Sequence, residues 1–163
     1  QFRTRCCLVV IDMHISRFNA EGYPDPTAAE ALENVIREEI AKGRKPCVFI
    51  CSPYAGDIKR NTINAKRYLK FAVDEGAIPF APHLLYPQVL DDSDPAQRRL
   101  GLLFGMVWLC KCDELWVFGS HISQGMAAEI DKAKRRLIPI RYFTENCEEV
   151  SGYEDSGRKQ PYG

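Results

Sequence analysis

The stretch CDELWVFGSHISQGMAAEI, residues 112–130, decides the fold. Residues 115–118 form a short apolar run with aromatic and β-branched side chains, typical of a buried strand. Residues 119–125 form a loop of small residues, and the apolar positions after it recur at helical spacing, so a helix is expected to begin near Ser123 or Gln124. Strand, glycine-containing loop and helix N-terminus together favour an anion site, because unpaired backbone N–H groups and the positive end of the helix dipole meet there.

The acidic residue of interest in this stretch is Glu129, about one and a half turns into the expected helix. A carboxylate there can face the loop, close to a phosphate that the loop would hold. The alternative is a glutamate on a solvated helix face that pairs with Lys132. The spacing alone leaves both interpretations open.

The chain from residue 46 onward alternates strands and helices. Strands are expected at 46–51, 78–84, 115–118 and 138–143, and helices at 58–75, 95–111 and after residue 123. This alternation predicts a three-layer α/β/α fold of the Rossmann or flavodoxin-like kind, with a mainly parallel sheet and right-handed crossovers.

The loops after the first three of these strands are expected to open at the same carboxyl edge, where ligands of open α/β sheets bind. Turn formation explains Ser52 and Gly56 equally well, and a histidine such as His83 is often structural. For Asp113 the alternative is a turn or cap at the start of a strand. The candidate site residues are Ser52, Tyr54, Gly56, His83, Asp113, Ser120, Ser123, Gly125 and Glu129.

Composition bounds the function. The 22 basic and 22 acidic residues cancel, which argues against a nucleic acid polymer or a membrane surface as partner. No apolar run reaches the roughly 18 residues that a membrane helix needs, and the first residues do not resemble a signal peptide. Seven cysteines, an odd number in mostly apolar contexts, indicate reduced thiols in a cytoplasmic protein. They lack zinc-site spacing, so neither a metal nor a cofactor is expected; helix capping by Asp94 explains the acidic loop 91–94 more simply than a metal does.

The remaining segments are expected to frame this domain. Residues 1–45 predict an extension of one strand, at 6–13, and one helix capped by Asp25 or Thr27. Residues 144–163 are polar and predict a loosely held tail. The helix at 95–111 is apolar on nearly all sides, so we expect it to form a subunit interface in a homo-oligomer.

The motif Ser123-x-Gly125-x-x-x-Glu129 after a buried strand resembles the nucleoside 2-deoxyribosyltransferase-like superfamily, which includes the 2′-deoxynucleoside 5′-phosphate N-hydrolases. The segments ICSPYAGD, APHLL, CDELWVFG and SQGMAAEI are most similar to a branch known by domain-of-unknown-function labels. The resemblance covers residues 46–143.

The resemblance implies roles for several residues. Glu129 would attack the anomeric carbon of the sugar, and its place near a helix N-terminus should keep it ionised. Asp113 would assist the departing base, and Ser123 would hold a 5′-phosphate. The tyrosine that positions the nucleophile in the superfamily falls on Phe49, so its hydroxyl is missing, and Tyr54 is a possible substitute.

The function expected from this resemblance is an N-glycosidase or deoxyribosyltransferase acting on a nucleoside or nucleotide. The alternative is a module that binds such a ligand without cleaving it, which the loss of the tyrosine at Phe49 favours. A third is a structural partner protein that works through the apolar helix.

Overall fold

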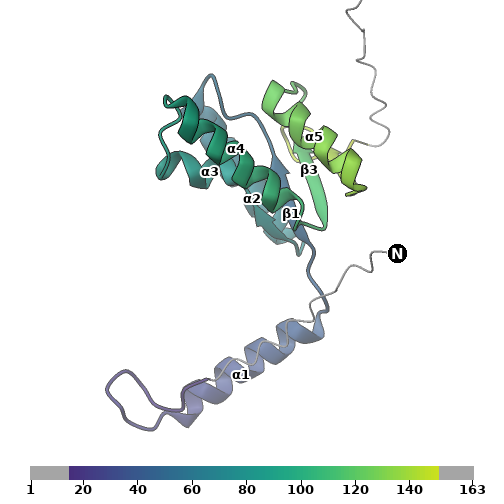
Figure 1. The fold of residues 1–163 in the computed structure, drawn as a ribbon. Coiled ribbons are helices and arrows are strands. Elements are labelled where there is room, and N and C mark those ends of the chain that lie inside the picture. The colour runs from purple at the N-terminus through teal and green to yellow at the C-terminus, as the bar shows by residue number, and fades with distance from the viewer. Residues whose placement is uncertain (1–14, 151–163) are drawn as a thin grey trace, which may run out of the picture. The chain divides into compact units, whose positions relative to one another are not determined.

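The computed structural model describes residues 15–150. The chain separates into two compact units, residues 1–44 and residues 45–163 (Figure 1). The first contains helix α1, Pro26–Ala41. A carboxylate oxygen of Asp25 accepts a hydrogen bond from the backbone N–H of Ala28 at 3.1 Å, which confirms the predicted cap. The predicted strand at 6–13 lies outside the described residues.

The second unit is built on a four-stranded parallel sheet in the order β2-β1-β3-β4. The strands are β1 Cys47–Cys51, β2 Ile78–Phe80, β3 Glu114–Phe118 and β4 Ile140–Phe143. The helices are α2 Ile58–Asp74, α3 Pro82–Leu85, α4 Pro95–Leu109 and α5 Gln124–Arg136, with a 3-10 turn η1 Tyr86–Gln88. The predicted three-layer α/β/α fold is confirmed.

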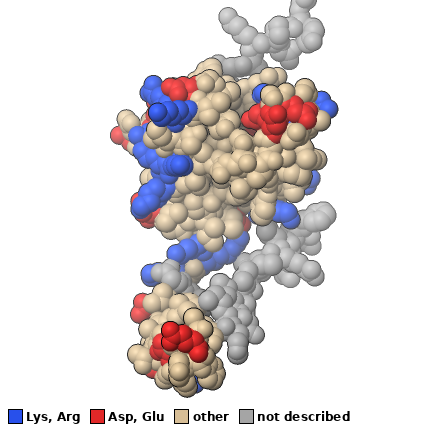
Figure 2. All heavy atoms as spheres, turned by 90° about the vertical axis from the view of Figure 1, so that its left-hand side faces the viewer, with Lys and Arg blue, Asp and Glu red and all other residues tan. Residues whose placement is uncertain are grey.

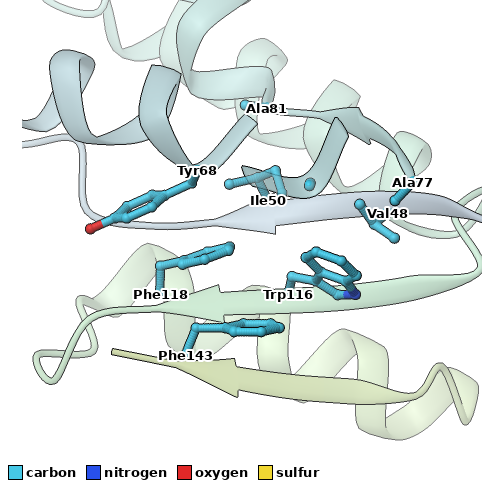
Figure 3. Packing of buried hydrophobic residues seen from close by; sticks show 9 residues of the cluster. Val48, Ile50, Tyr68, Ala77, Ala81, Trp116, Phe118 and Phe143 are labelled. Atoms are coloured by element: carbon cyan, nitrogen blue, oxygen red, sulfur yellow. The ribbon is translucent and has the colours of Figure 1, made fainter. Parts of the chain in front are cut away.

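Strand β1 is apolar along its whole length and β3 is apolar after Glu114, because helices cover both faces of the sheet. On one face, Tyr68 of α2 stacks on Phe118 with ring centroids 4.2 Å apart, and Phe118 stacks on Phe143 at 4.9 Å (Figure 3). The opposite face packs against α4 and α5. The buried residues of the core between this face and the two helices are Phe49, Cys51, Leu109, Leu115, Val117, Met126, Ile130 and Ala133. Alternate residues of β1 and β3 therefore belong to different cores.

Two predicted segments differ from the structure. The strand expected at 78–84 ends at Phe80, and Pro82 is the first residue of α3. Proline has no backbone N–H for the sheet and favours the first turn of a helix, which explains the change.

The start of the predicted C-terminal tail is also folded. Residues 144–150 turn back on β4, where the N–H of Val150 donates to the carbonyl of Tyr142 at 2.8 Å. Arg141 holds Glu149 with two hydrogen bonds of 2.8 and 2.7 Å. A bidentate ion pair of this kind fixes the returning segment against the edge strand.

Charged side chains are unevenly distributed over the second unit. Figure 2 shows Lys and Arg gathered along one side of this unit, while much of the rest of that face carries no charge. The basic residues of α2 are exposed, and two of them make contacts within the unit: Lys70 pairs with Asp74, and Arg67 donates to the carbonyl of Glu145.

Candidate functional site

The strand order places a topological switch point beside β1. Strand β1 has β2 on one side and β3 on the other, and Cys51, its last residue, lies opposite Val117 of β3. The chain leaves the two strands in different directions, which opens the carboxyl edge of the sheet between them. This edge is where ligands of doubly wound α/β folds bind.

Helix α5 brings its N-terminal turns to this edge. Ser123 is the N-cap residue, and its hydroxyl oxygen accepts a hydrogen bond from the backbone N–H of Met126 at 3.3 Å. A Cβ built on Gly125 would lie 4.0 Å from that hydroxyl oxygen. The motif that contains both residues thus starts the helix, and the glycine leaves the space beside the cap open.

Glu129 lies between two core residues of α5, Met126 and Ile130, and is itself partly buried. The thiol of Cys51, at the end of β1, hydrogen-bonds to its carboxylate. The thiol also lies 4.0 Å from the carbonyl oxygen of Met126. The carboxylate is thus held over the carboxyl end of β1 rather than paired with Lys132 on a solvated face.

Burial determines the protonation of Glu129. Loss of solvent raises its pKa from 4.5 to about 7, and the hydrogen bond from Cys51 opposes this shift. The expectation that a nearby helix N-terminus keeps this group ionised is therefore wrong at neutral pH, where both protonation states are populated. The same burial raises the pKa of the Cys51 thiol, so that it stays protonated and able to donate.

A second polar group lies where β1 and β2 end. The Oγ of Ser52, a buried residue, is 3.1 Å from Nε2 of His83 on α3. The ring of Tyr54 packs against that of His83 with centroids 6.1 Å apart. Burial lowers the pKa of His83 to about 4, so the imidazole is neutral at physiological pH and can donate or accept a hydrogen bond.

Ser52 and Tyr54 both contact His83, while the other predicted loop residues, all within the described part of the chain, have no contact with these three that bears on the site. Gly56 has φ +89° and precedes Asp57, which caps α2 by accepting from the N–H of Arg60 at 3.0 Å. Ser120 is exposed in the loop that follows β3. Tyr54 contacts His83, and it is Cys51 that contacts Glu129.

Asp113 does not belong to this edge, which corrects the prediction. It precedes β3, and its carboxylate accepts a hydrogen bond from the backbone N–H of Cys47, the first residue of β1, at 2.8 Å. A strand rises about 3.3 Å per residue, so the amino and carboxyl ends of β1 are roughly 13 Å apart. Asp113 therefore holds the starts of two strands and lies at the opposite end of the sheet from Glu129.

The sequence analysis missed Cys51. A cysteine at the end of an apolar strand is typical of a core residue, and Cys51 is fully buried. The available signal was its place as the last residue of a strand, immediately before the loop of the predicted site. Within residues 15–150, no three His, Cys, Asp or Glu side chains gather as metal ligands. No helix in this range is long and apolar enough to span a bilayer.

Comparison with known proteins places the chain in a group. A family model described as "Domain of unknown function (DUF7768)" matches residues 46–143. No curated protein is similar to the chain. Among solved structures, a 2-deoxyribosyltransferase from the bacterium Bacillus psychrosaccharolyticus is similar, with 16% identity, a TM-score of 0.49, and coverage of 60% of this chain and 72% of that one.

Proposed function

This chain belongs to the family described as "Domain of unknown function (DUF7768)", and we propose that it cleaves the bond between base and sugar in a nucleoside or nucleotide, with Glu129 as the nucleophile. It would be an N-glycosidase if water receives the sugar, and a 2-deoxyribosyltransferase if a second base does. The observation that carries the proposal is the position of Glu129, a partly buried carboxylate held by Cys51 at the carboxyl edge of the sheet.

The chemistry needs a carboxylate in such a place. The carboxylate oxygen bonds to the anomeric carbon as the bond to the base nitrogen breaks, through a transition state with oxocarbenium character. The base leaves with the bonding electron pair and takes up a proton from water. Water or another base then attacks the same carbon and releases the glutamate. Burial removes water from around the carboxylate, and an ionised carboxylate with fewer water contacts is a more reactive nucleophile.

The other polar groups at this edge are suited to substrate binding. Ser52 and His83 offer a hydroxyl and a neutral imidazole beside the ring of Tyr54, a combination that can hydrogen-bond and stack on a base or sugar. Ser123 and the first N–H groups of α5 support the binding of a 5′-phosphate. We propose that these groups, with the loop residues Gly56, Ser120 and Gly125, form the binding site.

One observation favours the alternative, a module that binds a nucleotide-derived ligand without cleaving it. Phe49, which replaces the positioning tyrosine of the resembled superfamily, is fully buried against Phe80, with ring centroids 6.4 Å apart. A protonated Glu129 would then serve as a hydrogen-bond partner for a sugar hydroxyl.

Incubation of the full chain with a panel of deoxynucleosides and their 5′-monophosphates, with and without a second free base, tests the proposal. Chromatography measures the released base and any exchanged nucleoside. Glu129→Gln keeps the size of the side chain and removes its charge. Asp131→Asn removes an exposed carboxylate from the same helix and is the matched control.

Base release that is lost in Glu129→Gln and kept in Asp131→Asn supports the proposal. An exchanged nucleoside identifies a transferase, and free base alone identifies a hydrolase. No release, together with a rise in melting temperature on addition of a nucleotide, contradicts the enzymatic proposal and supports the binding module.

We propose further that the protein forms a homo-oligomer through α4. Six large apolar residues of α4 are exposed, and all of them except Leu102 recur at positions i, i+3, i+4, i+7 and i+8; no charged residue occurs between Leu100 and Cys110. A second copy of the same helix can cover such a stripe without opposing charges, by twofold symmetry. The residues are Leu100, Leu103, Phe104, Val107 and Trp108.

A cytoplasmic location is also proposed, since the five described cysteines are free thiols.

A further inference from the structure

The end of β1 presents one polar atom to α5. Cys51 is fully buried on the face of the sheet that α4 and α5 cover, and among the buried residues of that core which the structure describes, its thiol is the one side-chain hydrogen-bond donor. Phe49, two residues earlier on the same face of the strand, carries no such group. Whatever directs the Glu129 carboxylate from β1 must therefore be the sulfur.

The thiol has two acceptors within reach, and both lie on α5. The carbonyl oxygen of Met126 is 4.0 Å from Sγ, at the outer limit of a sulfur hydrogen bond. The Glu129 carboxylate, one turn further along the helix, also accepts from the thiol. Because hydrogen bonds to an ionised acceptor are stronger, the thiol points to Glu129 when that group is charged.

We propose that Cys51 is the positioning residue of Glu129: its thiol holds the ionised carboxylate in one orientation over the carboxyl end of β1. When the carboxylate is neutralised, by a proton or by the covalent bond of the proposed reaction, the thiol turns to the Met126 carbonyl. The buried thiol of Cys51 then always has an acceptor, which lowers the free-energy difference between the ionised and neutral states of Glu129. The orienting role of Cys51 rests on the function proposed above, whereas the hydrogen bond between Cys51 and Glu129 does not depend on that function.

A titration of Glu129 in the free protein tests the hydrogen bond without any substrate. The side-chain carboxyl of 13C-labelled protein is followed by NMR over pH, and Glu129→Gln identifies its signal. Cys51→Ala removes the donor, and Cys51→Ser replaces it with a stronger one. Cys112→Ala is the matched control, because Cys112 packs against the same core and lies next to Asp113, at the other end of the sheet.

We expect the pKa of Glu129 to rise in Cys51→Ala and to return to the original value, or below it, in Cys51→Ser, with no change in Cys112→Ala. Equal values in all four proteins, or the same rise in Cys51→Ala and Cys112→Ala, would overturn the proposal. If Cys51→Ala does not fold, Cys51→Val fills the volume without a donor and must give the same rise.

Activity supplies the second readout. On the substrate that is cleaved fastest, Cys51→Ala should lower kcat by about tenfold with little change in KM, since one charge-assisted hydrogen bond is lost, and Cys51→Ser should restore it. A larger KM at unchanged kcat would instead show that the thiol acts on substrate binding and would overturn the positioning role. If no substrate is cleaved but the titration shifts as expected, the enzymatic proposal fails and the Cys51–Glu129 hydrogen bond stands.

Discussion

Asp113 and Cys47 are joined by a reciprocal pair of hydrogen bonds: the N–H of Cys47 donates to the carboxylate of Asp113 at 2.8 Å, and the backbone N–H of Asp113 donates to the Cys47 carbonyl at 2.7 Å. The pair locks the first residue of β1 to the residue before β3. An acidic residue just before a buried strand therefore sets the alignment of the two central strands.

Asp113→Ala should therefore reduce stability and leave the chemistry intact. Loss of the acceptor leaves a partly buried N–H unsatisfied, which costs roughly 1–2 kcal/mol of the free energy of unfolding. Urea denaturation measures this loss, and base release per folded molecule should equal that of the unchanged protein. A loss of turnover comparable with that in Glu129→Gln, in fully folded protein, would return Asp113 to the reaction.

Acid should destabilise the protein through His83. Burial lowers its pKa from 6.5 in the unfolded chain to about 4 in the folded one, so between these values the unfolded state binds more protons. The stability that His83 contributes is present above about pH 6.5 and is lost as the pH falls toward 4. His83→Gln should lose less stability over this window than the original protein, as urea titrations at several pH values would show.

The control for that titration is His121→Gln, because His121 is exposed in the loop after β3. It should follow the unchanged protein at every pH. If His83→Gln and His121→Gln respond alike, the acid sensitivity arises elsewhere.

Glu129 acts with the opposite sign. Its pKa is raised to about 7 in the folded chain, so the folded state binds the extra proton, and stability falls as the pH rises from about 4.5 to 7. The full effect is on the order of 3 kcal/mol. The stability of Glu129→Gln relative to the unchanged protein should therefore be higher at pH 8 than at pH 5. Thermal or urea unfolding of both proteins at the two pH values would detect this difference.

The rate of base release should depend on the same proton. The nucleophile must be ionised, so kcat/KM is expected to rise with pH and to level off above about pH 7. A rate that is flat between pH 5 and 8, with Glu129 shown to titrate in that range, would contradict its role as nucleophile.

Much of the fold followed from sequence because β1 and β3 are short apolar runs separated by amphipathic helices, and that alternation has few parallel solutions. The same logic, applied fully, would have excluded Asp113 from the site: it precedes its strand, and ligands of these sheets bind where strands end. The helical position of His83 was also readable, since Pro82 cannot donate to a sheet and suits a first helical turn.

The contact between Cys51 and Glu129 was beyond sequence reasoning. The two residues are far apart in the chain, and their contact depends on the position of α5 relative to the end of β1. The packing of Met126, Ile130 and Ala133 against the sheet sets this position. The high pKa of Glu129 has the same origin, because only the packed structure shows how little solvent reaches the carboxylate. The sequence shows that Glu129 lies near a helix N-terminus, which favours the ionised carboxylate, but it does not show that the carboxylate is buried.

The exposed stripe of α4 gives a prediction about assembly. Gly105 packs closely on Pro82 of α3, which lies 3.7 Å from a Cβ built on the glycine. Leu103 and Val107 of the same helix are exposed, and Phe104 and Trp108 stay partly exposed although their rings contact Tyr86 and Phe80. If two copies join through this stripe, Leu103→Lys should convert the oligomer to a monomer, because it places a charge at the centre of the contact. Light scattering after size-exclusion chromatography measures the mass, with Leu137→Lys, at a fully exposed position beyond α5, as the control. An unchanged monomer mass for the starting protein across a concentration series would contradict the self-association of α4.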